Sequence, residues 1–106
     1  MDFTQKKCIA CEAGGEPLSD NTIQKNLKSL PKWKLDGKMI YRDFEFKDFK
    51  EALNFVNRIG GLAESEGHHP DISIHWNKVR LDLWTHAING LSENDFIVAS
   101  KADKME

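Results

Sequence analysis

Residues 71–76 and 79–85 each alternate between apolar and polar side chains, the pattern of a strand that is buried on one face. The residues between them suit a turn, so the pattern predicts a β-hairpin. With the turn centred on residues 77–78, every apolar residue meets an apolar partner, as Trp76 meets Val79. The apolar stripe therefore fixes which face of the hairpin points to the core.

The same register, extended to the open end of the hairpin, places His69 opposite His86 with Asp71 diagonally beside it. Directly opposed residues have Cβ atoms roughly 4.5–5.5 Å apart, so two imidazoles and a carboxylate are expected to converge there. Histidine is the side chain that most readily moves protons near neutral pH. His75 faces Arg80 near the far turn in this register and is expected to be a bystander.

Three helices and a second hairpin complete the predicted order of elements. The apolar spacing and the capping residues predict helices that start at Ser19, Asp48 and Ser92, and a hairpin that turns at Asp36-Gly37. Four strands with one apolar face need helices to cover it, so the expected fold class is α+β, a two-layer sandwich. Pro31 is expected to close the first helix.

Several details of these elements are specific enough to test. In the first hairpin, Trp33 is expected opposite Ile40 and Leu35 opposite Lys38, with Arg42 intruding on the apolar face. Gly60-Gly61 near the end of the second helix suggests a frayed or bent last turn, or close approach of a ligand or another chain. The apolar stripe of that helix is expected to consist of Phe49, Ala52, Leu53, Val56, Ile59 and Ala63.

Length and composition narrow the class of protein. The 106 residues allow one domain, which we place at residues 19–106 after an irregular N-terminal arm, residues 1–18. A formal net charge of −2 gives no electrostatic footprint for nucleic acid or an anionic membrane. No run of residues approaches the roughly 18 apolar residues of a membrane span, and the N-terminus has no apolar signal region. These features are typical of a reduced, cytoplasmic protein.

Three local features remain open to two interpretations each. Cys8-x-x-Cys11 could be half of a zinc site or a redox pair, but without a second cysteine pair two unpaired thiols are favoured. Asp95 is expected to cap its helix, or to reach the His86 end of the hairpin. Trp84, on an otherwise polar sheet face, suits either a ligand or a partner subunit. The residues alone leave metal-bound and metal-free histidine chemistry equally open.

The combined motifs resemble the pterin-4a-carbinolamine dehydratase family over nearly all of the chain after Leu18. The residues that carry the resemblance are Glu64-x-x-x-His68-His69-Pro70-Asp71, Trp76-x-x-Val79-x-Leu81-x-Leu83-x-Thr85-His86, Gly90-Leu91-Ser92-x-x-Asp95 and the flanking Trp33 and Phe44-x-Phe46-x-x-Phe49-x-x-Ala52-x-x-Phe55. Two positions depart from the family pattern. Ala87 stands where an acidic residue commonly follows the Thr-His pair, and Trp76 stands where an aromatic residue, often tyrosine, is usual.

The resemblance implies a four-stranded antiparallel sheet with three helices on one face. It implies dehydration of 4a-hydroxytetrahydrobiopterin, a product of aromatic amino acid hydroxylases, without metal or organic cofactor. It also implies homodimers or homotetramers and possible contact with such a hydroxylase, but no nucleic acid or membrane partner. By position, His68, His69 and His86 would be catalytic, and the residues that line or support the site would be Glu64, Pro70, Asp71, Thr85 and Asp95.

Two other functions stay open beside this one. A protein with the same fold could be a non-catalytic binding module, such as a dimerisation or transcription cofactor, or it could hold a metal in a His/Asp site. Animal relatives serve as cofactors of a homeodomain transcription factor. The N-terminal Cys-x-x-Cys arm is similar to that of bacterial members, so that role is not expected here.

Overall fold

The computed structural model of the protein describes residues 3–6, 8 and 16–106. Two short 3₁₀ helices span Phe3–Gln5 and His86–Ile88. The other elements are α1 (Asp20–Leu27), β1 (Lys34–Asp36), β2 (Met39–Glu45), α2 (Phe49–Glu66), β3 (Asp71–His75), β4 (Lys78–Leu83) and α3 (Glu93–Asp103).

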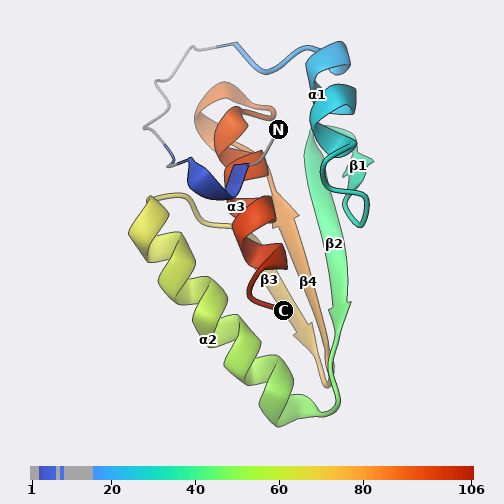
Figure 1. The fold of residues 1–106 in the computed structure, drawn as a ribbon, viewed down its shortest axis with the longest axis vertical. Helices are drawn as coiled ribbons and strands as arrows, with labels where there is room; N and C mark the ends of the chain where they lie inside the picture. Colours follow the sequence, from blue (N-terminus) through green and yellow to red (C-terminus); the bar gives the residue numbers. More distant parts are fainter. Residues whose placement is uncertain (1–2, 7, 9–15) are drawn as a thin grey trace.

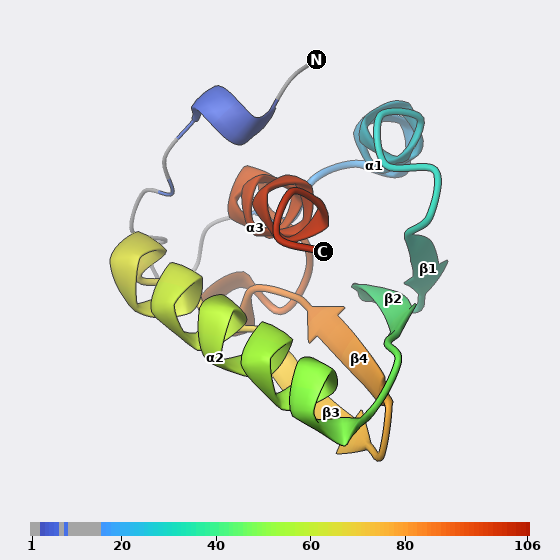
Figure 2. The same ribbon diagram turned by 60° about the horizontal axis from the view of Figure 1, so that its bottom comes forward.

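The four strands form one antiparallel sheet in the order β1-β2-β4-β3. The three α-helices lie on one side of this sheet, with α2 along the β3–β4 side, α1 beside β1 and α3 between them (Figure 1 and Figure 2). This arrangement confirms the predicted α+β class. Helix α2 runs antiparallel to β2 and ends near the point where β4 ends, so the segment after α2 is brought beside the end of β4.

The core lies between the sheet and the helices. Alternate residues of β2 and β4 point into it, and Ile40, Phe44, Val79 and Leu81 are at most 1% exposed. The Phe44 ring packs on Phe55 of α2 with ring centroids 4.7 Å apart. Each such side chain contributes about 1.5–3 kcal/mol by its burial, and together they hold α2 and the sheet in a fixed relation.

The ends of α2 are defined by two capping residues. The Asp48 carboxylate accepts a hydrogen bond from the Glu51 N–H at 2.9 Å, as the capping box predicts. Gly67 ends the helix in the left-handed conformation, with φ 66°, which glycine adopts at little cost. The helix continues through Gly60-Gly61 to Glu66, so the prediction of a frayed end at the glycine pair is wrong. A Cβ at either glycine would meet nothing within 4 Å.

The predicted register of the β3–β4 hairpin is wrong by two residues. Ile74 lies opposite Val79, and the two central residues of the turn are Trp76 and Asn77, with Trp76 at φ 53°. A shift of two residues leaves the same side chains on the buried face, so the alternation could not detect it. Trp76 is 67% exposed as a consequence, and His75 faces Lys78 rather than Arg80.

The predicted register of the β1–β2 hairpin is wrong by the same amount. Leu35 lies opposite Ile40, not Lys38, and Trp33 precedes the strand. The turn centres on Gly37-Lys38, one residue later than expected, because Gly37 takes the positive φ of 61° that such a turn requires. This shift places Lys38 in the turn, where it points toward residues that follow β4.

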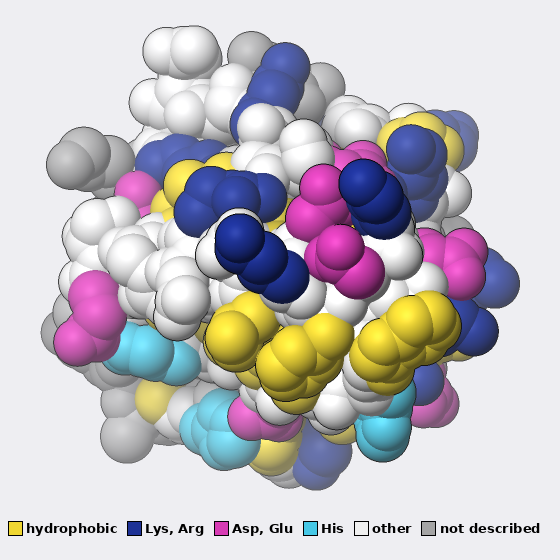
Figure 3. Space-filling view, turned by 90° about the horizontal axis from the view of Figure 1, so that it is seen from below, with side chains coloured by type: hydrophobic (Ala, Val, Ile, Leu, Met, Phe, Trp, Pro, Cys, Tyr) yellow, Lys and Arg dark blue, Asp and Glu magenta, His cyan; other side chains and the backbone are white. Residues whose placement is uncertain are grey.

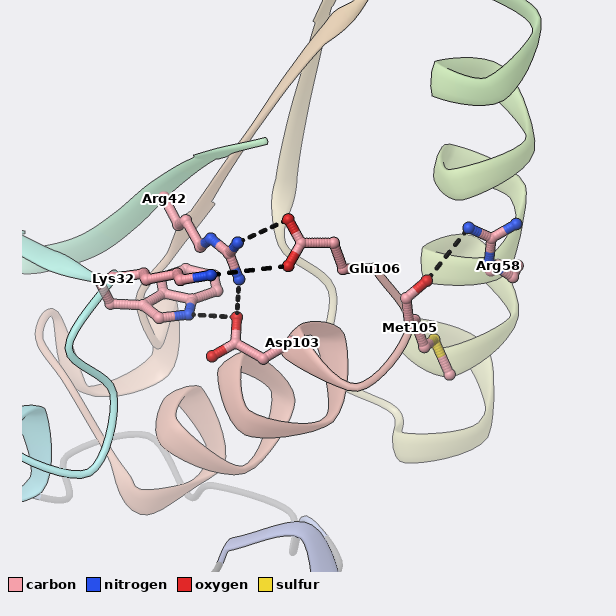
Figure 4. A network of polar contacts seen from close by, with 7 residues as sticks. Lys32, Arg42, Arg58, Asp103, Met105 and Glu106 are labelled. Atoms are coloured by element: carbon pink, nitrogen blue, oxygen red, sulfur yellow. Dashed lines mark hydrogen bonds and ion pairs between the residues drawn. The ribbon is translucent and has the colours of Figure 1, made fainter. Parts of the chain in front are cut away.

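Arg42, the charged intruder on the apolar face of β2, is 5% exposed and fully paired (Figure 4). Its guanidinium donates to Asp103 at the end of α3 and, at 2.8 Å, to Glu106. The Trp33 indole N–H donates to the same Asp103 carboxylate at 2.9 Å. A buried charge is tolerated when it is paired and hydrogen-bonded, so this network fastens the end of α3 to the sheet.

The predicted apolar stripe of α2 is partly wrong. Phe49 and Leu53 are 47% and 42% exposed, whereas Phe55 and Leu62 face the core. Seen from the end where α2 begins, hydrophobic side chains form a row beside charged groups (Figure 3). We refer to the large exposed apolar residues as the exposed apolar set, which consists of Leu35, Phe49, Leu53, Ile72 and Trp76.

Candidate active site

A cavity of about 560 Å³ opens where the segment after α2 meets the end of β4. Three stretches of chain line it: residues 66–71 between α2 and β3, residues 84–87 after β4, and Asn94 in the first turn of α3. The Gly67 cap turns the chain out of α2 immediately before the two adjacent histidines. The segment that carries the two histidines is therefore held at one end by α2 and at the other by β3.

His68 is held by a buried carboxylate. Its backbone N–H donates to the Ala63 carbonyl at 3.3 Å, and its ring nitrogen Nε2 lies 2.6 Å from Asp95 Oδ1. The His68 side chain is 13% exposed and the Asp95 side chain 0%. The imidazole therefore has one nitrogen bonded to Asp95 while the ring borders the cavity.

Asp95 both caps α3 and bonds Thr85, the residue before His86, so the two roles weighed for it are combined, and it also reaches His68. Its Oδ2 accepts from the Ser92 N–H at 2.9 Å, which forms the capping box, and from the Thr85 hydroxyl at 2.8 Å. With His68 on Oδ1, the carboxylate has three partners from three segments. Hydrogen bonds to a charged acceptor are about twice as strong as neutral ones, so this buried group fixes the orientation of His68.

His69 is also bonded to a carboxylate, but in solvent. Its Nε2 lies 2.7 Å from Glu64 Oε2, and the two side chains are 59% and 80% exposed. His69 lines the cavity, and Glu64 stands behind it on the last turn of α2. Like His68–Asp95, this pair joins an imidazole Nε2 to a carboxylate oxygen, but it lies in solvent, where the dielectric constant is much higher than in the protein interior.

His86 reaches the cavity by a different route from the one predicted. Strand β4 ends at Leu83, and the Thr85 backbone bonds to Gly90 in both directions, at 2.8 and 3.3 Å. Because this bridge turns the chain away from β3, His86 begins a 3₁₀ helix and does not lie opposite His69 in a β-ladder. The expected pairing is wrong, although both histidines line the same cavity.

The structure places all eight candidate site residues at or beside this one cavity. His68, His69, Pro70, Asp71, Thr85 and His86 line the cavity, and Glu64 and Asp95 support two of the histidines. Asp71 pairs across the sheet with Asp82 and reaches the cavity from the first position of β3. Ala87 also lines the cavity and offers no polar group there.

Two further cavity residues, Glu66 and Asn94, carry no signal in the sequence that predicts their place at the site. Glu66 accepts from the Cys8 N–H at 2.9 Å and from the Lys101 ammonium at 2.7 Å. These two hydrogen bonds lower the pKa of the Glu66 carboxyl below its usual range. No sequence pattern linked residue 8 to residue 66, because the contact joins segments that are far apart along the chain.

Cys8 is a poor candidate for redox or metal chemistry in this conformation. Burial, together with the adjacent Glu66 charge, raises the pKa of its thiol to about 12, so the thiol stays protonated at neutral pH. Cys11 lies outside the described residues, and the Cys-x-x-Cys prediction is untested. Among the residues that the structure describes, no three His, Cys, Asp or Glu side chains are grouped closely enough to hold a metal ion.

Within the described part of the chain, no helix is long and apolar enough to cross a bilayer.

Comparison with known proteins gives one consistent result. The family model described as pterin 4 alpha carbinolamine dehydratase matches residues 16–105. A relative from Alkaliphilus metalliredigens is 48% identical, with 99% of this chain and 96% of the relative covered, and one from Chlorobaculum tepidum is 45% identical, with 94% of each covered. Both carry the name of pterin-4-alpha-carbinolamine dehydratase as a provisional assignment.

Solved structures agree with this result. A crystal structure from Brucella melitensis, named as a transcriptional coactivator/pterin dehydratase, is 34% identical with a TM-score of 0.81, covering 85% of this chain and 98% of that one. A pterin dehydratase-like protein identified as a RuBisCO assembly factor in the alpha-carboxysome is 24% identical with a TM-score of 0.60, covering 69% and 87%. The second likeness concerns the fold alone.

Proposed function

Because the chain belongs to the pterin 4 alpha carbinolamine dehydratase family, a family of hydro-lyases, we propose that it converts 4a-hydroxytetrahydrobiopterin to quinonoid dihydropterin and water. This reaction recycles the pterin that an aromatic amino acid hydroxylase leaves behind, and such a hydroxylase is the expected source of substrate. One observation carries the proposal: His68, His69 and His86 line one cavity of about 560 Å³, with the buried Asp95 bonded to His68. That volume is in the range of sites that enclose small organic molecules.

The chemistry requires two proton transfers. The bond between C4a and oxygen breaks as a general acid protonates the departing hydroxyl, which leaves as water. A base takes the proton from N5, and the electron pair of that N–H bond forms the C4a–N5 double bond. Each positioned acid or base typically contributes about 10²–10⁴-fold, which the histidines of this cavity would supply.

We assign one of the two proton transfers to His68. Its Nε2 is bonded to Asp95, so exchange with a substrate in the cavity goes through Nδ1. The buried carboxylate stabilises the imidazolium that forms when the ring accepts a proton, and it holds the ring in one orientation. His69 and His86 border the same cavity and are the candidates for the second transfer.

We further propose that the reaction needs neither metal nor organic cofactor. Nε2 of His68 and Nε2 of His69 are each bonded to a carboxylate, which is the arrangement of an acid–base pair. The expected result is full activity in excess chelator, with no stoichiometric metal in the purified protein. Activity that is lost on chelation and restored by zinc or iron would favour the metal-site alternative.

We propose that the protein works as a homodimer or homotetramer. Strands β1 and β3 form the two edges of the sheet, so each has a neighbouring strand on one side only among the described residues, and the exposed apolar set is on the surface. Both features favour association with a second copy. Sedimentation at micromolar concentration is expected to show a dimer or larger species, and a protein that stays monomeric would contradict this assignment.

Stopped-flow spectroscopy of freshly generated 4a-hydroxytetrahydropterin tests the main proposal. The protein is expected to accelerate loss of the intermediate well above the buffer rate, with saturation in substrate. A rate equal to that of buffer alone, with folded protein, would contradict the proposed function.

A binding role without catalysis is the alternative that the exposed apolar set favours. The 34% identical structure named as a transcriptional coactivator is consistent with such a role in that protein. The two functions separate cleanly in a variant with His68, His69 and His86 all changed to Ala. Catalysis requires that this variant lose its biological effect, whereas a binding module would keep it.

A further inference from the structure

Trp84 and His86 form an aromatic stack at the edge of the cavity. Their ring centroids are 4.0 Å apart, and the ring planes are inclined by 38°. Trp84 directly follows β4, and it is half-buried against the core between the buried Leu83 and Thr85. Both residues line the cavity, so the stack forms part of its wall.

Lys38 connects this stack to the turn between β1 and β2. Its ammonium lies 5.2 Å from the Trp84 ring centroid and donates to Asn89 Oδ1 at 2.6 Å. Asn89 ends the 3₁₀ helix in the left-handed conformation, with φ 54°, and its N–H bonds the His86 carbonyl at 3.1 Å. Lys38 therefore contacts the ring that packs on His86 and also the residue that closes the turn around His86.

We propose that Trp84 is the positioning residue for His86, and that Lys38 holds Trp84 and Asn89 in place. His68 and His69 are oriented by carboxylates, whereas the contact that orients the His86 imidazole is a flat indole. The neighbouring Ala87 carries no group that could do so. Aromatic rings in close contact favour a limited range of relative orientations, so the indole restricts the imidazole to directions that face the cavity.

The catalytic part of this inference rests on the proposed dehydratase function. If Trp84 acts by orienting His86, its loss should reduce turnover rather than substrate binding. We expect Trp84→Leu to lower kcat about tenfold with KM changed by less than about twofold, and Trp84→Phe, which keeps a ring, to stay within about threefold of wild type. Trp76→Leu, assayed where sedimentation shows the same oligomeric state as wild type, is the matched control, because Trp76 is 67% exposed at the β3–β4 turn and does not line the cavity.

A double-mutant cycle separates positioning from an independent role. In a His86→Ala background, Trp84→Leu should cause no further loss of kcat, because the group that it orients is already absent. A second tenfold loss in that background would show that Trp84 acts without His86 and would overturn the proposal.

Proton NMR of the imidazoles tests the geometry without any assay of activity. The His86 ring protons of the wild type should be shifted upfield of those of exposed His75 by the indole ring current. They should move back toward the His75 values in Trp84→Leu and stay shifted in Trp84→Phe. Lys38→Met, a surface change, should move the His86 ring-proton shifts part of the way toward the His75 values and lower kcat about threefold. Lys38→Arg, which keeps the charge, should leave both the shifts and kcat unchanged.

These readouts keep the two proposals distinct. A wild type that is inactive but shows the upfield His86 signals would contradict the dehydratase function and support the positioning role. His86 signals that coincide with those of His75 in the wild type would overturn the positioning role, whatever the activity.

Discussion

Two histidine–carboxylate pairs at one cavity differ mainly in their exposure to solvent. The Nε2–oxygen distance is 2.6 Å for His68–Asp95 and 2.7 Å for His69–Glu64. The Asp95 side chain is 0% exposed and the Glu64 side chain 80%. Adjacent residues in the sequence thus place the same two chemical groups in a protein interior and in water.

The difference shows which pair can be rigid. Asp95 is fixed by hydrogen bonds from Thr85 and from the Ser92 backbone, so its position does not depend on His68. Glu64 is on a solvent-facing turn of α2, where water and salt compete for its charge. Electrostatic interactions are several times stronger at low dielectric, so we assign the main catalytic contribution to the buried pair.

The largest expected effect follows the removal of His68. His68→Ala should lower the dehydration rate at least about 100-fold, because a positioned acid or base is lost. It should also lower the free energy of unfolding by about 1–3 kcal/mol, since the buried Asp95 loses one partner. Stopped-flow rates and urea unfolding measure the two effects. A variant of unchanged stability would show that the buried pair is not coupled to folding.

His69→Ala should separate activity from stability. We expect the rate to fall at least about tenfold, because His69 borders the substrate cavity. The free energy of unfolding should stay within about 0.5 kcal/mol of wild type, as for other exposed substitutions. The same two measurements apply. If His69→Ala destabilised the protein as much as His68→Ala, the claim that the buried pair contributes more to stability than the exposed pair would be contradicted.

Glu64→Gln tests the weaker carboxylate directly. The rate should fall by no more than about fivefold, since water can replace an exposed hydrogen-bond partner. The difference between wild type and variant should shrink as salt is raised from 0.05 to about 0.5 M, because exposed charges are screened. A loss that is large and independent of salt would mean that Glu64 acts on the substrate itself.

The smallest expected effect is that of His75→Ala. His75 lies opposite Lys78 next to the β3–β4 turn, at the end of β3 away from the cavity. The dehydration rate of the His75→Ala variant should be within about twofold of wild type. Its free energy of unfolding should be within about 0.5 kcal/mol of wild type. If this variant kept its fold but lost activity, the reaction would need a histidine outside the cavity, which would contradict the account.

The sequence predicted most of the fold because local rules agree with one another. The capping residues Asp48 and Ser92 set the starts of α2 and α3, and the alternation set the buried face of the hairpins. The hairpin registers were wrong by two residues because period-two alternation is unchanged by that shift. The turn was decided instead by which residue accepts a positive φ: Gly37 in one hairpin and, less predictably, Trp76 in the other.

The site was predicted as a group of residues but not as a geometry. The motif placed His68, His69 and His86 together, whereas the route of His86 depended on the backbone bridge between Thr85 and Gly90, which no alternation reveals. The two roles of Asp95 were predicted only as alternatives, since a capping box accounts for the residue fully without His68. Long-range contacts such as that of Cys8 with Glu66 leave no local pattern at all.

The central claim is that the buried carboxylate, not the exposed one, makes this cavity catalytic. The direct measurement compares the dehydration rates of wild type, Asp95→Asn and Glu64→Gln on 4a-hydroxytetrahydropterin in one buffer, with circular dichroism to verify folding. Asp95→Asn keeps the shape of the side chain and removes its charge, so we predict a loss of at least about 100-fold, against fivefold or less for Glu64→Gln. A folded Asp95→Asn variant as active as Glu64→Gln, or less impaired, would contradict the claim.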